Sequence, residues 1–186
     1  MIGLLPDSLS VNGKDIPIRS TDFRVALIVF QAYEDPNLTV NEKEFIVLDA
    51  LLGFENIPKD SINDAYQKCC WYLDGGKEPD RRAYKPKLMD WEQDEQMIFS
   101  AVNHVAGKEL RTEKHIHWWT FLGYFDEIQE GLFSTVLSIR QKKNKNKKLE
   151  KWEKDFYMEN RDLIDIKPKR SEAEKKRMEE INRKFQ

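Results

Sequence analysis

The sequence has little cysteine and no long apolar run. Its only cysteines, Cys69 and Cys70, are adjacent, a spacing that neither a disulfide framework nor a zinc site uses. No stretch reaches the roughly 18 consecutive apolar residues that a membrane-spanning helix needs. Met1–Leu9 has no basic region ahead of its apolar residues, so we expect no secretory signal. These absences predict a reduced, cytosolic protein without a membrane anchor.

Motifs of the common enzyme classes are also missing, since GxSxG, P-loop, HExxH and GxGxxG patterns do not occur. His115 and His117 are two residues apart and would point to different sides of a helix, while His104 belongs to another segment. The carboxylates within Asp126–Glu130 are explained more simply as the polar flank of an amphipathic helix than as an acid/base pair. We therefore expect no enzyme, no metal and no cofactor.

Charge is distributed unevenly along the chain. Residues 142–186 contain 16 Lys and Arg against 10 Asp and Glu, a net of +6, whereas the other 141 residues carry 15 against 23, a net of −8. We predict a helical body over residues 1–141 and a basic, charged helical tail over residues 142–186. Such a tail either stays a solvated helix, which is the simpler interpretation, or meets an acidic partner.

Apolar periodicity predicts a mainly α fold, a compact multi-helix bundle with a short N-terminal β-hairpin and the charged tail. Asn12-Gly13 favours a type I′ turn that pairs Leu9 with Ile16. The segment 23–30 is apolar on nearly all sides, which predicts a central buried helix. Helices are expected over about residues 23–33, 40–52, 62–73, 91–106, 118–128, 132–142, 149–157 and 171–185.

The most informative stretch is His115–Lys143, HIHWWTFLGYFDEIQEGLFSTVLSIRQKK. From Trp118 its apolar residues recur at i, i+3, i+4, i+7 and i+10, which predicts a continuous buried helix face. Trp119 and Tyr124 flank that face. Two further segments are candidates for partner contact, the loop Gly76–Leu88 and the run Lys142–Lys148, which we expect to be a solvated hinge. The residues predicted to contact a partner are Trp119, Tyr124, Arg81, Arg82, Tyr84, Lys142, Lys143 and Lys145.

The last segment, Ser171–Phe185, opens with a capping box formed by Ser171 and Glu174. Its apolar residues are few, namely Ala173, Met178, Ile181 and Phe185. So thin a stripe rarely holds a helix on a body, so we expect its helicity to need a partner or to remain partial.

Three segments, Asp90–Arg111, His115–Ile128 and Leu132–Lys143, together resemble the bacteriophage gene product fifteen family. The features that carry this resemblance fall on Asp94, Ser100, His117, Trp118, Trp119, Phe121, Gly131, Phe133, Ile139 and Arg140. The residues assigned to the family pattern and the core are Trp118, Phe121, Leu122, Phe125, Phe133, Ile139 and Arg140.

The resemblance implies a tail assembly chaperone-like protein of siphophages, which is not an enzyme and acts in the host cytoplasm. Such a protein would bind the tape-measure protein during tail morphogenesis, with other tail proteins and further copies of itself as additional partners. One alternative is a structural component of the virion, in the tail or the head–tail connector. A nucleic-acid-binding module that uses Lys142–Lys148 is less favoured, because acidic residues interrupt the basic tail and the aromatic residues have a core-like period.

Overall fold

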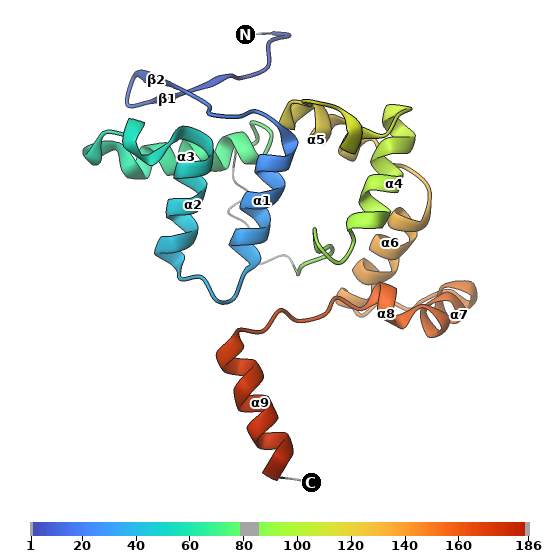
Figure 1. The fold of residues 1–186 in the computed structure, drawn as a ribbon. Coiled ribbons are helices and arrows are strands. Elements are labelled where there is room, and N and C mark those ends of the chain that lie inside the picture. The colour runs from blue at the N-terminus through green and yellow to red at the C-terminus, as the bar shows by residue number, and fades with distance from the viewer. Residues whose placement is uncertain (1, 79–85, 185–186) are drawn as a thin grey trace. The chain divides into compact units, whose positions relative to one another are not determined.

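The computed structural model describes residues 2–78 and 86–184, which are mainly helical and include a short N-terminal hairpin (Figure 1). The predicted fold class is thereby confirmed. The chain divides into two compact units, the first made of Met1–Gly76 with Pro168–Gln186 and the second of Lys77–Lys167. This division does not coincide with the predicted one, because residues 141 and 142 both lie inside helix α6 (Leu132–Asn144).

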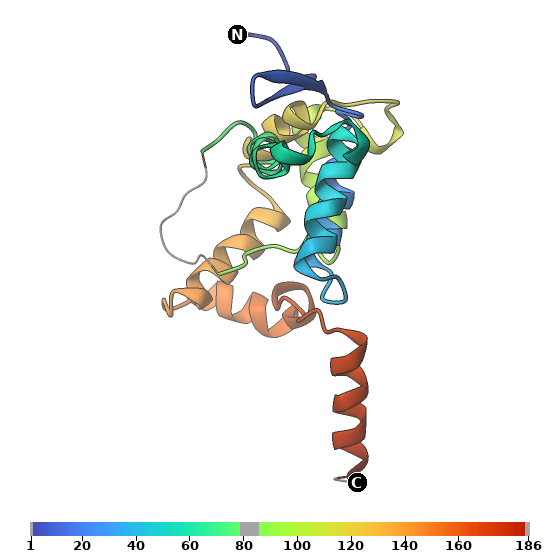
Figure 2. The same ribbon diagram turned by 90° about the vertical axis from the view of Figure 1, so that its left-hand side faces the viewer.

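The first unit begins with an antiparallel hairpin beside α3 (Ile62–Leu73; Figures 1 and 2). Leu9 pairs with Ile16 as predicted. Asn12 and Gly13 both have positive φ, 47° and 79°, as the predicted turn type requires. The elements of this unit are β1 (Ser8–Val11), β2 (Lys14–Pro17), α1 (Phe23–Glu34), α2 (Val40–Leu52), η1 (Phe54–Asn56), η2 (Lys59–Ser61), α3 (Ile62–Leu73) and α9 (Glu172–Lys184).

Local capping explains where the first two helices begin. The Asp22 carboxylate accepts a hydrogen bond from the Arg24 amide at the start of α1. Thr39 and Glu42 form a capping box at the start of α2. The expectation that α1 is buried on nearly all sides is wrong, because Ile28 is 59% exposed while Phe23 is buried. The helix has one buried face rather than a fully buried circumference.

The second unit contains α4 (Glu95–Ala106), η3 (Leu110–Thr112), α5 (Trp118–Asp126), α6 (Leu132–Asn144), α7 (Lys151–Glu159) and α8 (Arg161–Ile164). α4 starts later than predicted. Asp90 caps a turn through the amides of Glu92 and Gln93, at 3.0 and 2.8 Å, and Asp94 becomes the N-cap position of the helix. α5 ends at Asp126, two residues earlier than predicted.

Residues 142–167 belong to this second unit. The last turn of α6 includes Lys142, Lys143 and Asn144, so the predicted solvated hinge over Lys142–Lys148 is wrong for its first three residues. The two lysines make ion pairs with residues of the α7 and α8 region, as described below. None of the helices within residues 2–78 and 86–184 combines the length and the apolar character needed to span a bilayer.

Candidate partner-binding groove

The aromatic stretch forms the core of the second unit. Trp118 stacks on Phe121 with ring centroids 5.7 Å apart and an interplanar angle of 17°. Phe121 meets Phe99 of α4 edge-on at 6.0 Å, and Phe125 meets Phe133 of α6 edge-on at 5.8 Å. Such offset and edge-to-face pairs are the favoured aromatic arrangements. α4, α5 and the start of α6 are thus joined by ring contacts.

The structure places the residues assigned to the core as follows. Trp118, Phe121, Phe133, Ile139 and Arg140 are buried, whereas Leu122 and Phe125 are half-buried. His117 is the N-cap of α5, and its Nδ1 accepts a hydrogen bond from the Trp119 amide at 3.0 Å.

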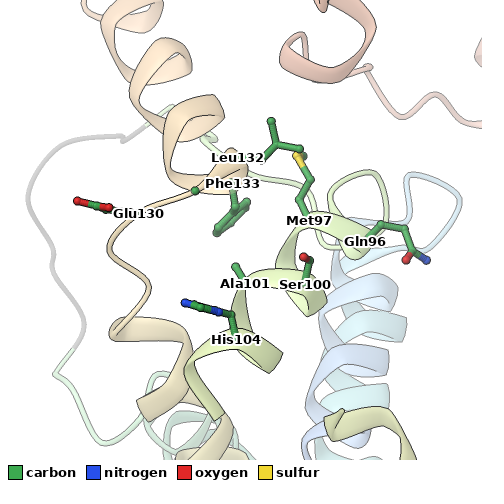
Figure 3. Close-up of a pocket in the computed structure, with 9 residues that line it drawn as sticks. Gln96, Met97, Ser100, Ala101, His104, Glu130, Leu132 and Phe133 are labelled. Atoms are coloured by element: carbon green, nitrogen blue, oxygen red, sulfur yellow. The ribbon is translucent and has the colours of Figure 1, made fainter. Parts of the chain in front are cut away.

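A groove of about 460 Å³ lies between α4 and the start of α6 (Figure 3). α4 contributes a stripe at i, i+3, i+4 and i+7, and the opposite wall comes from the residues that precede and begin α6. Phe133 projects from the start of α6 toward α4. The lining residues are Gln96, Met97, Ser100, Ala101, His104, Glu130, Gly131, Leu132 and Phe133.

The groove is apolar inside and polar at its edges. Met97 and Phe133 are buried, and the small side chains of Ser100 and Ala101 leave room for an incoming side chain. Leu132, 50% exposed, adds an accessible apolar group. The exposed polar residues Gln96, His104 and Glu130 complete the lining. Concave, mostly apolar surfaces with a few polar groups are typical binding sites.

A buried ion pair fixes the two helices that line the groove. The Arg140 guanidinium is 4% exposed and the Asp94 carboxylate is fully buried. Nη1 and Nη2 donate to the two Asp94 oxygens at 2.5 and 2.9 Å, which is the bidentate arrangement. The Asp94 carboxylate also accepts the Asp90 amide at 2.9 Å. This pair ties the first residues of the α4 region to the middle of α6.

Arg140 uses every hydrogen-bond donor that an arginine side chain has. Besides the two bonds to Asp94, Nε donates to the carbonyl of Ile164 at 2.6 Å, Nη1 to that of Leu88 at 3.0 Å and Nη2 to that of Leu163 at 2.9 Å. Five N–H groups therefore meet five acceptors. The full set of partners offsets the cost of burying this charge.

A second ion pair joins α6 to α7. The Lys142 ammonium donates to both carboxylate oxygens of Glu153, at 2.6 and 2.8 Å, and Glu153 is buried. Glu153 also accepts the Glu150 amide at 2.8 Å. These hydrogen bonds, that from Lys142 foremost, hold the pKa of Glu153 below its ordinary value of 4.5.

The remaining candidate contact residues have mixed surroundings. Lys143 pairs with Asp165 at 2.5 Å, and its ammonium lies 3.7 Å from the centre of the Tyr157 ring. Like Lys142, it is therefore engaged in contacts within the second unit. Lys145 is exposed, and Trp119 and Tyr124 are half-buried. None of these lines the groove. Three predicted contact residues, Arg81, Arg82 and Tyr84, lie outside the described residues.

Sequence reasoning missed most of the groove. Ser100, Gly131 and Phe133 had been singled out as features of the family pattern, but not as neighbours. Met97 and His104 went unassigned, although their spacing on α4 marks one face together with Ser100 and Ala101. Leu132 and Glu130 join them only because the chain turns at Gly131, where φ is 125°, a value that strongly favours glycine.

The two cysteines lie outside the groove. Cys69 is buried, and this burial raises the pKa of its thiol to about 12. Among residues 2–78 and 86–184, no three His, Cys, Asp or Glu side chains lie close enough together to hold a metal ion.

Comparison with known proteins places the chain in a family. The model of the family described as "Bacteriophage Gp15 protein" matches residues 1–166 and so includes every residue of the groove and of the Arg140 network. No curated protein and no solved structure matches the chain. Since the match covers well over half of the 186 residues, the chain belongs to the bacteriophage Gp15 protein family.

Proposed function

We propose that this phage protein is a non-enzymatic binding protein of tail morphogenesis, which acts in the host cytoplasm as a chaperone-like factor for the tape-measure protein. In this proposal the groove between α4 and α6 receives a large apolar side chain from a helical segment of that partner.

One observation carries the proposal. The residues on which the family resemblance rests do two related things: Ser100, Gly131 and Phe133 line the groove, while Asp94 and Arg140 hold its two helices. An apolar groove between two fixed helices suits the recognition mode in which a helix inserts apolar anchors at i, i+3, i+4. The accessible Leu132 supports the proposal, because it provides apolar surface for such an anchor.

Of the two alternatives, nucleic-acid binding has less support. A nucleic-acid module over Lys142–Lys148 would rely on lysines of which the first two are engaged with Glu153 and Asp165. A virion component is distinguished by mass spectrometry of purified particles, which would contain the protein only if it is retained after assembly.

The proposal is tested by co-expressing the chain with the tape-measure protein and measuring the yield of the co-purified complex. Leu132→Asp should reduce this yield at least about tenfold, because it places a charge in the apolar groove. The melting temperature should not fall, since Leu132 is exposed at the first position of α6, where an acidic residue suits the helix dipole.

Leu5→Asp is the matched control, because Leu5 is also 50% exposed but lies outside the groove. It should leave the complex intact. The proposed function is contradicted if the tape-measure protein never co-purifies with the chain at low salt. Equal losses from Leu132→Asp and Leu5→Asp would instead contradict the assignment of the groove.

A further inference from the structure

The start of α9 is held by hydrogen bonds, whereas its side chains are exposed to solvent. Its capping box is formed, because the Ser171 amide donates to Glu174 at 2.9 Å and the Glu174 amide donates to the Ser171 hydroxyl at 3.2 Å. The Glu172 amide donates to Asn37 in the turn between α1 and α2 at 2.9 Å. From Glu172 to Ile181 every side chain is exposed. A helix of this length is marginal in water unless one face is covered.

One face of α9 has the spacing of a coiled-coil seam. Ser171, Glu174, Met178 and Ile181 are separated by three, four and three residues, which is the alternation of a and d positions in a heptad. Met178 and Ile181 are the apolar members, 41% and 39% exposed. They form a narrow apolar patch that is exposed on the surface of α9.

Basic residues border this patch on both sides. Lys175 occupies an e position and Arg177 a g position, while Glu179 and Glu180 fall on the far side of the helix. Lys175 pairs with Glu172 at 2.7 Å, but both side chains are more than half exposed, and such surface pairs contribute little. The border of the seam is therefore available to an anionic partner at small cost.

The charges select against pairing between two copies of α9. In a two-stranded coiled coil, e and g residues of the two helices face each other across the seam, and like charges there are unfavourable. A partner helix with Asp or Glu beside its own apolar seam would instead make opposite-charge pairs and cover Met178 and Ile181 at the same time.

We propose that α9 is a docking helix for an acidic amphipathic helix, a partner segment with apolar a and d positions flanked by carboxylates. This inference is independent of the proposed function, because α9 lies beyond residue 166, where the family match ends, and does not line the groove.

The experiment uses the full chain and two synthetic four-heptad peptides. Both carry Leu at every a and d position, and one has Glu, the other Lys, at every e and g position. The chain should bind the Glu peptide at least about tenfold more tightly than the Lys peptide by calorimetry, and high salt should weaken this binding. Equal affinity for the two peptides, or no binding to either, would overturn the proposal.

Variants test whether α9 is the binding element. Met178→Asp with Ile181→Asp should abolish binding, whereas Ile28→Asp with Met158→Asp, which makes the same changes at exposed sites outside α9, should preserve it. Lys175→Glu with Arg177→Glu should reverse the preference toward the Lys peptide. Equal losses in both double Asp variants would overturn the proposal, and so would an unchanged preference after the charge reversal.

Sedimentation of the chain alone tests the other possible partner of α9, which is the α9 of a second copy of this chain. A dimer that forms as concentration rises and dissociates on introducing Met178→Asp with Ile181→Asp would show that α9 pairs with itself, and the acidic partner would be rejected. The proposal expects no such α9-dependent dimer.

Discussion

Residues 142–167 and residues 168–186 follow each other in the chain and carry the same net charge, but most of their charged side chains have different surroundings. The first stretch has nine Lys and Arg against six Asp and Glu, and the second has seven against four, so each has a net of +3. In the first, Lys142 and Lys143 are paired with carboxylates of the same unit. In the second, Lys169 pairs with Glu34 of the first unit at 3.1 Å, but the basic residues of α9 at positions 175–177 and 183 are exposed.

The difference lies in the acceptors that each stretch meets. Residues 142–167 supply a buried carboxylate, Glu153, and two backbone carbonyls to the ion-pair network of α6. The described part of α9 has no buried residue. Net charge alone therefore does not separate a structural segment from a docking segment, whereas the partners of the charged groups do. The family match ends at residue 166, near the same boundary.

The largest effect is expected from Arg140→Ala, which removes the donor to the Leu163 and Ile164 carbonyls of the first stretch. It leaves the Asp94 carboxylate buried without its partner, so the free energy of unfolding should fall by about 3–5 kcal/mol. Urea denaturation followed by tryptophan fluorescence measures this loss.

Two controls define the origin of that loss. Arg140→Lys keeps the charge but offers three donors in place of five, so an intermediate loss is expected. Arg177→Ala removes an arginine from α9 and should change the stability by less than about 0.5 kcal/mol. Equal losses for Arg140→Ala and Arg177→Ala would contradict the contrast between the two stretches.

A smaller effect is expected from Glu153→Gln, which should cost about 1–3 kcal/mol at neutral pH because Lys142 loses its ionised partner. The pKa of Glu153 is lowered in the folded state, so its contribution is complete above the ordinary value of 4.5 and disappears as the pH falls through the folded pKa. The difference between wild type and variant should therefore narrow below about pH 4.5. A constant difference from pH 7 to pH 2 would rule out this role of the ionised carboxylate.

The smallest effect on global stability is expected from Lys176→Pro in the middle of α9. Proline removes a helix hydrogen bond and clashes with the preceding turn, so the circular dichroism signal at 222 nm should weaken. The free energy of unfolding should change by less than about 0.5 kcal/mol, because α9 buries no side chain among its described residues. A loss above about 1 kcal/mol would show that α9 stabilises its unit.

Features that depend on neighbours in the chain were predictable. Asp22, Thr39 and Ser171 cap helices as their local sequence indicates, and the hairpin turn at Asn12-Gly13 has the predicted register. Each of these interactions joins residues that are only a few positions apart, so local patterns were enough to predict them.

Features that depend on distant residues were not predictable in the same way. Arg140 and Asp94 are 46 residues apart, and Lys142 and Glu153 are 11 apart on different helices. The family resemblance assigned Arg140 to the family pattern and the core, but it named none of the partners of the guanidinium group. The burial of this charge is explained only when all five of its acceptors are known.

The Arg140 network also has a consequence for the order in which this protein can fold during synthesis. Its acceptors extend from Leu88 to Ile164, so the buried guanidinium cannot be fully hydrogen-bonded until the ribosome has passed residue 164. A nascent chain that ends within α6 would hold an arginine with three of its five bonds at most. The second unit, and the groove with it, is therefore expected to become stable only late in translation, when α8 has emerged.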